Sequence, residues 1–132
     1  MKLPIPLHPI SVHFPIAFYF LELVLLIFWG VKRDSSYLRF ARFSFRAGYL
    51  FMIVAIIVGL VDAGGIDGIT GRVRTHFFAA ASVFALYTGR AFFWRFVKED
   101  HPFYRFGHIT LSLAGNLLVA LTGYFGGLLV YK

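Results

Sequence analysis

Two histidines that begin long apolar segments are the residues of this sequence best suited to chemistry. His13 lies in the opening motif that runs from His8 to Pro15, and His76 begins the third apolar segment. A histidine inside a membrane is costly, so a functional or structural role is expected of each one. Imidazole is a common axial ligand of haem iron. The two residues are therefore candidate ligands of a membrane-bound cofactor.

An internal similarity gives these two histidines equivalent positions. Aligning the chain with itself so that His13-Phe14 falls on His76-Phe77 also places Gly64 on Gly127. Such a match indicates a tandem repeat of two-helix hairpins, related by a pseudo-twofold axis along the membrane normal as in some transporters. We expect His13 and His76 to lie at the same depth, near the outer face.

The spacing of helices in a bundle favours haem over a single metal ion. In an up-down-up-down bundle the first and third helices are diagonal, and adjacent axes about 8–10 Å apart imply a diagonal of roughly 11–14 Å. A tetrahedral metal needs its ligand atoms about 2 Å away, which would draw the helices much closer. We therefore expect a b-type haem with His13 and His76 as axial ligands. Arg72 and Arg74 just precede His76 and are expected to pair with its propionates.

Other roles for the same residues remain open. His8 precedes the first helix and can simply cap it, and with His13, His76 and Asp62 it could instead bind a transition metal. Asp62 could also accept a hydrogen bond from a ring nitrogen of His13 or His76. Pro15 disturbs the helix near its start, and a local hydrogen bond from His13 could repair that loss. In that case His13 would serve structure alone.

The remaining polar residues of the apolar segments are expected to serve structure. Glu22 lies near the middle of the first segment, where we predict an ion pair with Arg90 or Arg46 rather than a proton relay. His101 and His108 lie toward the basic side of the membrane, and the second apolar segment has no histidine to oppose them. We interpret both as interfacial.

The elements that carry these residues are four apolar segments, at about residues 9–31, 40–61, 75–97 and 104–131. Each is about 22 residues or longer, enough to cross a bilayer as a helix. With 59% apolar and 20% aromatic residues, the 132-residue chain does not resemble a soluble domain. The short connections make neighbouring helices antiparallel. We predict one all-α membrane domain, a four-helix bundle over residues 1–132.

The charges predict an orientation in the membrane. The net charge is +7, but the basic residues lie between apolar runs, which argues against nucleic-acid binding. One side carries nine of them and the other carries four. The larger group is Lys32, Arg33, Arg39, Arg42, Arg46, Arg90, Arg95, Lys98 and Arg105, and the smaller group is Lys2, Arg72, Arg74 and Lys132. By the positive-inside rule, we expect both termini outside a bacterial plasma membrane.

Three motifs resemble a widespread prokaryotic family. They are the opening His8-Pro-x-x-Val-His-Phe-Pro15, Gly59-Leu-Val-Asp62, and the final Gly126-Gly-x-Leu-Val-Tyr131. The family is catalogued as domain of unknown function 2231 and consists of predicted four-helix membrane proteins. Members occur alone or joined to Rieske-type or c-type cytochrome domains, so the resemblance implies an electron-transfer setting.

These observations leave three hypotheses about function. The first is a small b-type haem protein or electron-transfer subunit that exchanges electrons with quinol or an outer-side redox protein. The second is an accessory or assembly subunit of a larger membrane complex, and the third is transition-metal binding or transport by the outer-side histidines. The absence of cysteine excludes thiolate haem and Cys-ligated clusters. No nucleophile with its base and no Walker loop is present, which favours a non-catalytic subunit over an enzyme.

Overall fold

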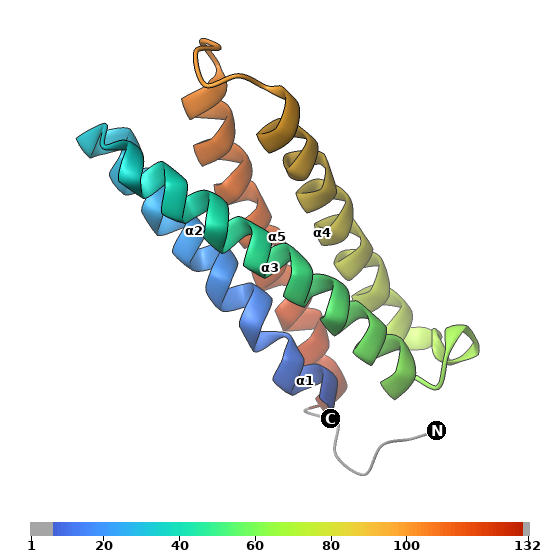
Figure 1. Ribbon diagram of the computed structural model, residues 1–132. Helices are drawn as coiled ribbons and strands as arrows, with labels where there is room; N and C mark the ends of the chain where they lie inside the picture. Colours follow the sequence, from blue (N-terminus) through green and yellow to red (C-terminus); the bar gives the residue numbers. More distant parts are fainter. Residues whose placement is uncertain (1–6, 131–132) are drawn as a thin grey trace.

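The protein is an all-α four-helix membrane bundle, for which a computed structural model describes residues 7–130 (Figure 1). Lys2, Lys132 and the predicted helix end at Tyr131 lie outside the described residues. Four helical stretches are long and apolar enough to cross a membrane. The elements are α1 (Leu7–Ser11), α2 (His13–Lys32), α3 (Ser35–Asp62), the 3₁₀ helix η1 (Ile66–Gly68), α4 (Gly71–Phe96) and α5 (Tyr104–Val130).

A proline divides the first membrane helix into α1 and α2. Pro15 has no N–H to donate to the Ser11 carbonyl, and its ring crowds that carbonyl. The helix is interrupted at Val12. Backbone bonds from Val12 to His8 (3.1 Å) and from Ile16 to Val12 (3.3 Å) keep the two pieces close to one helix. The short α1, which carries His8, therefore continues α2 with only a local interruption.

Two of the helices begin earlier than the apolar pattern predicted. α3 begins at Ser35 rather than near residue 40, because the Asp34 carboxylate accepts a hydrogen bond from the Ser36 N–H (2.9 Å). Hydrogen bonds from Ser36 hold the pKa of Asp34 below its usual value. α4 begins at Gly71 rather than near residue 75. The helix starts thus lie outside the apolar runs, and at α3 a polar capping residue sets the position.

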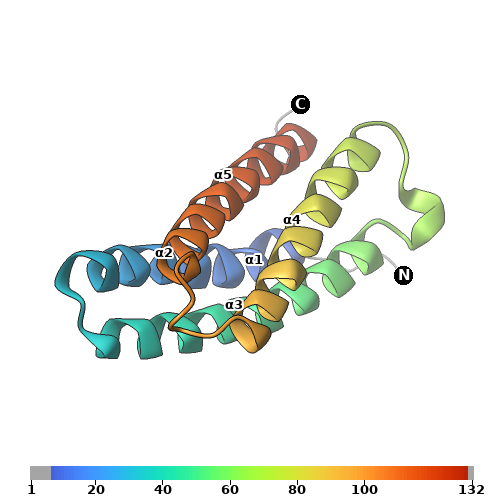
Figure 2. The same ribbon diagram turned by 90° about the horizontal axis from the view of Figure 1, so that it is seen from above.

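The helices form two hairpins that cross at an angle. α2 packs along α3, and α4 packs along α5. α2 also packs on α5, whereas α3 meets α4 much less. Figure 2 shows the hairpins side by side near the α2–α3 turn, with α5 leading away from α1 toward its carboxyl end. We call the end with residues 32–39 and 95–105 the basic end, and the end with residues 7–13, 62–76 and 123–130 the histidine end.

The two hairpins are related as a repeat. Three residue pairs from the first membrane helix and α4 meet across the bundle, and each pair has the same sequence separation of 68. The pairs are His8 with His76, stacked Tyr19 with Tyr87 (ring centroids 3.7 Å), and Glu22 with Arg90. The predicted repeat placed His13 on His76, a separation of 63, whereas the residue pairs that meet across the bundle are separated by 68.

In each hairpin, the tyrosine of the first helix packs against a glycine of the second helix. An added Cβ at Gly48 would lie 2.9 Å from the Tyr19 ring, and one at Gly115 would lie 2.7 Å from Cζ of Tyr87. In the register that places Tyr19 on Tyr87, Gly48 falls on Asn116, the direct neighbour of Gly115. Each tyrosine therefore reaches the central stack across a glycine of its own hairpin. This stack is the middle of the core, which also contains Phe45.

Candidate functional site

His8 and His76 meet between the two hairpins at the histidine end. His8 comes from α1 and His76 from the second turn of α4. Their Nε2 atoms are 3.4 Å apart, and their ring planes are inclined by 76° with centroids 5.7 Å apart. The site thus contains one imidazole from each hairpin.

The second nitrogen of each ring fixes its tautomer. Nδ1 of His8 lies 2.8 Å from the Ala55 carbonyl oxygen, and Nδ1 of His76 lies 3.1 Å from that of Thr122. A carbonyl only accepts, so each Nδ1 must carry the hydrogen and donate it. In the neutral rings both Nε2 atoms are then acceptors. Two lone pairs face one another, which is an arrangement that suits a cation.

Glycines allow the imidazoles to lie against the second helix of each hairpin. A Cβ at Gly59 on α3 would come within 2.8 Å of His8 Nδ1. A Cβ at Gly126 on α5 would come within 3.0 Å of His76 Cε1. Both glycines belong to the motifs that carry the family resemblance. Their role here is to leave room for the two rings.

Asp62 orients His8 through the backbone rather than through a ring. Its Oδ2 atom accepts a hydrogen bond from the His8 backbone N–H at 2.9 Å. The predicted bond to a ring nitrogen of His13 or His76 is absent among the bonds of the described residues. The carboxylate at the end of α3 instead caps α1. It thereby fixes the helix that presents His8 to His76.

His13 does not take part in the pair. It is exposed, and its Nδ1 atom donates to the Pro9 carbonyl oxygen at 2.7 Å. The structure does not bring the predicted partner His13 to His76, and His8 lies there instead. His13 follows His8 by five residues, about 140° around a helix, so the two side chains lie on different faces and only His8 meets His76.

The two arginines expected at the site lie at its edge. Arg72 and Arg74 are exposed in the first turn of α4, where Arg72 lies one turn before His76 and Arg74 only two residues before it. Nη1 of Arg72 lies 3.5 Å from the Leu128 carbonyl oxygen, and Arg74 lies over the Phe78 ring at 5.5 Å. Neither is in an ion pair within the described part of the chain. Both guanidinium groups remain free to meet an anionic group.

Near the His8–His76 pair, one face of α5 has no other helix packed against it. Nearer the start of α5, the same face contacts α2 through Ser112, which bonds Glu22, and through Asn116, which donates to the Tyr19 carbonyl (3.3 Å). Farther along α5, Gly123 and Gly127 lie on the same face as Asn116, because α-helices have 3.6 residues per turn. A Cβ at either glycine would meet no atom within 4 Å. The divergence of the hairpins thus leaves space next to His76.

The number of protein ligands limits which metal ion or cofactor could bind between His8 and His76. Within residues 7–130, no group of three His, Cys, Asp or Glu residues is placed to hold one metal ion. A cation between His8 and His76 therefore has two imidazole ligands from this part of the chain. Any further ligands must come from a cofactor or from solvent.

A buried ion pair lies in the middle of the bundle. Arg90 Nη1 donates to Glu22 Oε1 at 2.6 Å, and both side chains are completely buried. Ser112 Oγ donates to the same carboxylate oxygen at 2.9 Å. The structure thus contains the expected pairing of Glu22 with Arg90. Arg46, the other partner considered, is exposed on α3.

His108 is a core residue and not an interfacial one. Its side chain is fully buried against Trp94, with ring centroids 3.9 Å apart, and against Phe93 and Tyr104 at 4.5 Å each. Sequence reasoning missed this. The signal was available, because His108 lies one helical turn before Ser112 and continues the polar stripe of α5. His101 is exposed in the loop, as predicted.

Fold and site together define the class of this protein: an all-α membrane protein whose two helical hairpins present paired imidazoles to one another. The chain belongs to the family described as predicted membrane protein (DUF2231), which matches residues 4–132. This finding confirms the family predicted from the sequence. No curated protein and no solved structure matches the chain.

Proposed function

We propose that the protein is a small membrane b-type cytochrome, whose haem is bound between the two hairpins by His8 and His76. The observation that carries this proposal is the pair of Nε2 lone pairs that face one another at 3.4 Å, each fixed by an Nδ1 bond to a carbonyl. Ligating histidines typically donate their other N–H in this way, which sets the tautomer and raises ligand basicity.

Haem suits a site with only two protein ligands. Its macrocycle provides four nitrogen ligands, so the iron needs one imidazole from each face. Two metal–imidazole bonds of about 2 Å require the Nε2 atoms to be about 4 Å apart. The rings would separate by a few tenths of an ångström from their 3.4 Å distance. Because each imidazole comes from a different hairpin, a movement of one hairpin relative to the other would widen the Nε2 separation.

The surroundings favour a planar group at this place. Gly123 and Gly127 leave one face of α5 uncovered next to His76. Arg72, one turn before His76 on the same helix face, is suited to pair with a propionate, and Arg74 lies two residues before His76 at the edge of the site. The donor set, the uncovered face and the free basic groups therefore agree with a haem between the hairpins.

The cofactor would give the protein one-electron chemistry. His8 and His76 then set the potential through their bonds to Ala55 and Thr122, which tune the imidazoles. In a bacterial plasma membrane with the basic end inside, the site lies near the outer face. Quinol or an outer-side redox protein is the partner proposed for electron exchange.

An absorption spectrum of the purified protein tests this proposal. The protein is produced with ample haem and measured with and without dithionite. We expect a Soret band and, after reduction, an α band. A protein that folds and carries neither band contradicts the proposal.

A transition-metal site is the second candidate, and the distance between the Nε2 atoms of His8 and His76 favours it. Two nitrogens bound to one tetrahedral metal at about 2.0–2.1 Å are about 3.3 Å apart. The observed Nε2 separation of 3.4 Å is close to this value. The measurement is metal analysis after gentle purification: one equivalent of zinc or copper without a Soret band supports this candidate. Finding neither metal excludes it.

A further inference from the structure

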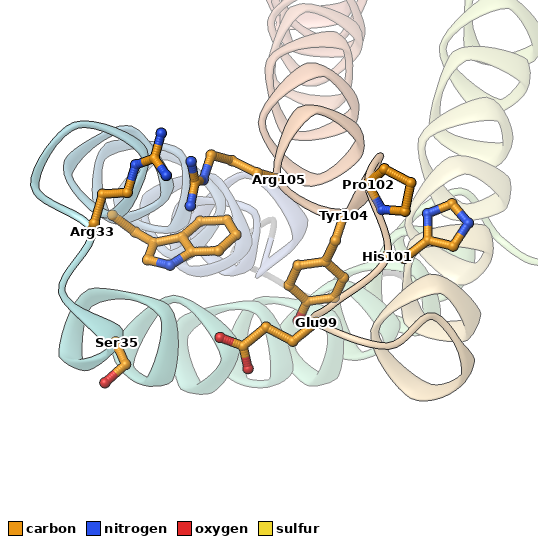
Figure 3. A pocket seen from close by; sticks show the side chains of 8 residues that line it. Arg33, Ser35, Glu99, His101, Pro102, Tyr104 and Arg105 are labelled. Carbon is orange, nitrogen blue, oxygen red and sulfur yellow. The ribbon is translucent and has the colours of Figure 1, made fainter.

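A cleft of about 380 Å³ lies at the basic end, far from the histidine pair. Its lining includes Trp29 near the end of α2, with Arg33 and Ser35 at the α2–α3 turn. On the other side it includes Glu99 of the α4–α5 connection and Arg105 at the start of α5 (Figure 3). α2 ends at Lys32 and α5 begins at Tyr104. The cleft therefore lies where two membrane helices reach the headgroup region.

The cleft holds two positive charges that the described chain does not neutralise. The guanidinium groups of Arg33 and Arg105 point toward one another in Figure 3. Like charges repel, so this arrangement favours an anion between them. Within residues 7–130 the one ion pair is that of Arg90 with Glu22, so neither arginine of the cleft is paired with a carboxylate there. Glu99 also lines the cleft, and its carboxylate extends toward the side of Ser35 (Figure 3), but within residues 7–130 it forms no ion pair with either arginine.

Both arginines are positioned by their surroundings. Arg33 has a left-handed backbone conformation (φ 57°), and its N–H donates to the Trp29 carbonyl at 2.8 Å. The Arg105 guanidinium lies over the Trp29 ring, 5.3 Å from its centroid. The Nε atom of Arg105 is buried and has no hydrogen-bond partner within the described chain. Stacking thus fixes the guanidinium plane and leaves donors for a ligand.

We propose that this cleft binds the phosphate group of an anionic phospholipid headgroup. Guanidinium groups form paired hydrogen bonds to phosphate oxygens, and such charge-assisted bonds are about twice as strong as neutral ones. A lipid is the source that fits the location, since phosphates of the bilayer lie at the depth where α2 ends and α5 begins. Trp29 agrees, because tryptophan is enriched at the membrane interface.

The test is native mass spectrometry of delipidated protein in detergent, titrated with phosphatidylglycerol, phosphatidylcholine or inorganic phosphate. We expect phosphatidylglycerol to bind at least about tenfold more tightly than phosphatidylcholine, whose choline group the arginines repel. Arg33→Gln and Arg105→Gln should each weaken phosphatidylglycerol binding about tenfold, the loss of one charge-assisted contact. Arg95→Gln is the matched control, because Arg95 is exposed at the same end and lies over Phe96, outside the cleft.

Three results would overturn the proposal. They are equal affinity for the two lipids, equal weakening in all three variants, and binding of inorganic phosphate without retention of lipid, which would assign the cleft to a soluble anion. If Arg105→Gln does not fold, Arg105→Lys keeps the charge and removes the planar donor pair. It should then bind phosphatidylglycerol more weakly than the unmodified protein, and unchanged binding would contradict the assignment.

Discussion

At the scale of single residues, the imidazole pair depends on two glycines that bind nothing themselves. Gly59 and Gly126 allow His8 and His76 to lie against α3 and α5, where each ring finds its carbonyl partner. A side chain at either position would push the ring away from that partner. The orientation of both Nε2 atoms thus depends on the absence of a Cβ.

Gly59→Ala should therefore weaken cofactor binding without unfolding the bundle. The new Cβ would lie 2.8 Å from His8 Nδ1, so the ring must move and lose its bond to Ala55. Loss of such a supporting bond typically costs about 10–100-fold in affinity. Haem titration of the apoprotein, followed at the Soret band, measures the effect.

Gly89→Ala is the control for this substitution. Gly89 is an exposed glycine of α4, and a Cβ there meets no atom within 4 Å. The Gly89→Ala variant should bind haem as the unmodified protein does. Its free energy of unfolding should be higher by roughly 0.5–1 kcal/mol, because alanine has a higher helix propensity than glycine. Equal haem affinity in the two variants would show that Gly59 does not position His8.

The sequence indicated that histidines of the two hairpins would pair, but it did not indicate which histidines. Paired histidines from the two hairpins were predictable, because His76 and the opening motif begin apolar segments. Which histidine faces inward was not predictable, because His8 and His13 lie about 140° apart around a helix and only one of them can meet His76. His13 is instead bonded to the Pro9 carbonyl. Aligning His8 with His76 would also have aligned Tyr19 with Tyr87.

At the scale of helices, the central contact is a charge pair surrounded by aromatic rings. Glu22 on α2 and Arg90 on α4 join the two hairpins, and Ser112 adds a bond from α5. Arg90 also lies over Phe45 on α3, 5.0 Å from the ring centroid. One salt bridge thus contacts all four membrane helices.

Removing one member of this ion pair should lower the stability of the bundle far more than removing both members. Glu22→Leu leaves Arg90 buried without its counter-ion, which costs about 3–5 kcal/mol. Glu22→Leu combined with Arg90→Leu leaves no buried charge and should recover most of that loss. Unfolding of the purified variants by denaturing detergent measures the three stabilities. Additive losses in the double variant would contradict a direct coupling.

The helices themselves were largely predictable, and their ends were not. Runs of about 20 apolar residues specify membrane helices because backbone groups must be satisfied inside lipid. The start of α3 depends on one hydrogen bond from Ser36 to Asp34, which lies in a charged stretch without apolar periodicity. The buried His108 was missed for a related reason, since a single histidine near a helix start resembles an interfacial residue.

At the scale of the whole molecule, the two ends of the bundle are chemically distinct. The α3–α4 connection lies at one end of the bundle and the α2–α3 turn and the α4–α5 connection lie at the other (Figure 1). The paired imidazoles belong to the first end, and the arginine cleft belongs to the second. The positive-inside rule predicts that the basic end faces the cytoplasm. The histidine end would then face outward.

Single cysteines test this orientation cleanly, because the chain has no cysteine of its own. Ile66→Cys in the α3–α4 connection and Lys98→Cys in the α4–α5 connection change exposed residues. A membrane-impermeant maleimide should label the first variant in intact cells and the second only after permeabilisation. The reverse pattern would place the histidine pair on the inside.

The most direct test of the central claim compares three histidine variants in one absorption experiment. His8→Ala and His76→Ala each remove one of the two facing imidazoles, whereas His13→Ala removes an exposed ring that bonds only Pro9. We predict that the dithionite-reduced spectrum of haem-loaded protein keeps its Soret and α bands in His13→Ala. The same bands should be lost or strongly changed in the other two variants. Loss of the bands in His13→Ala together with their retention in His8→Ala would contradict the account.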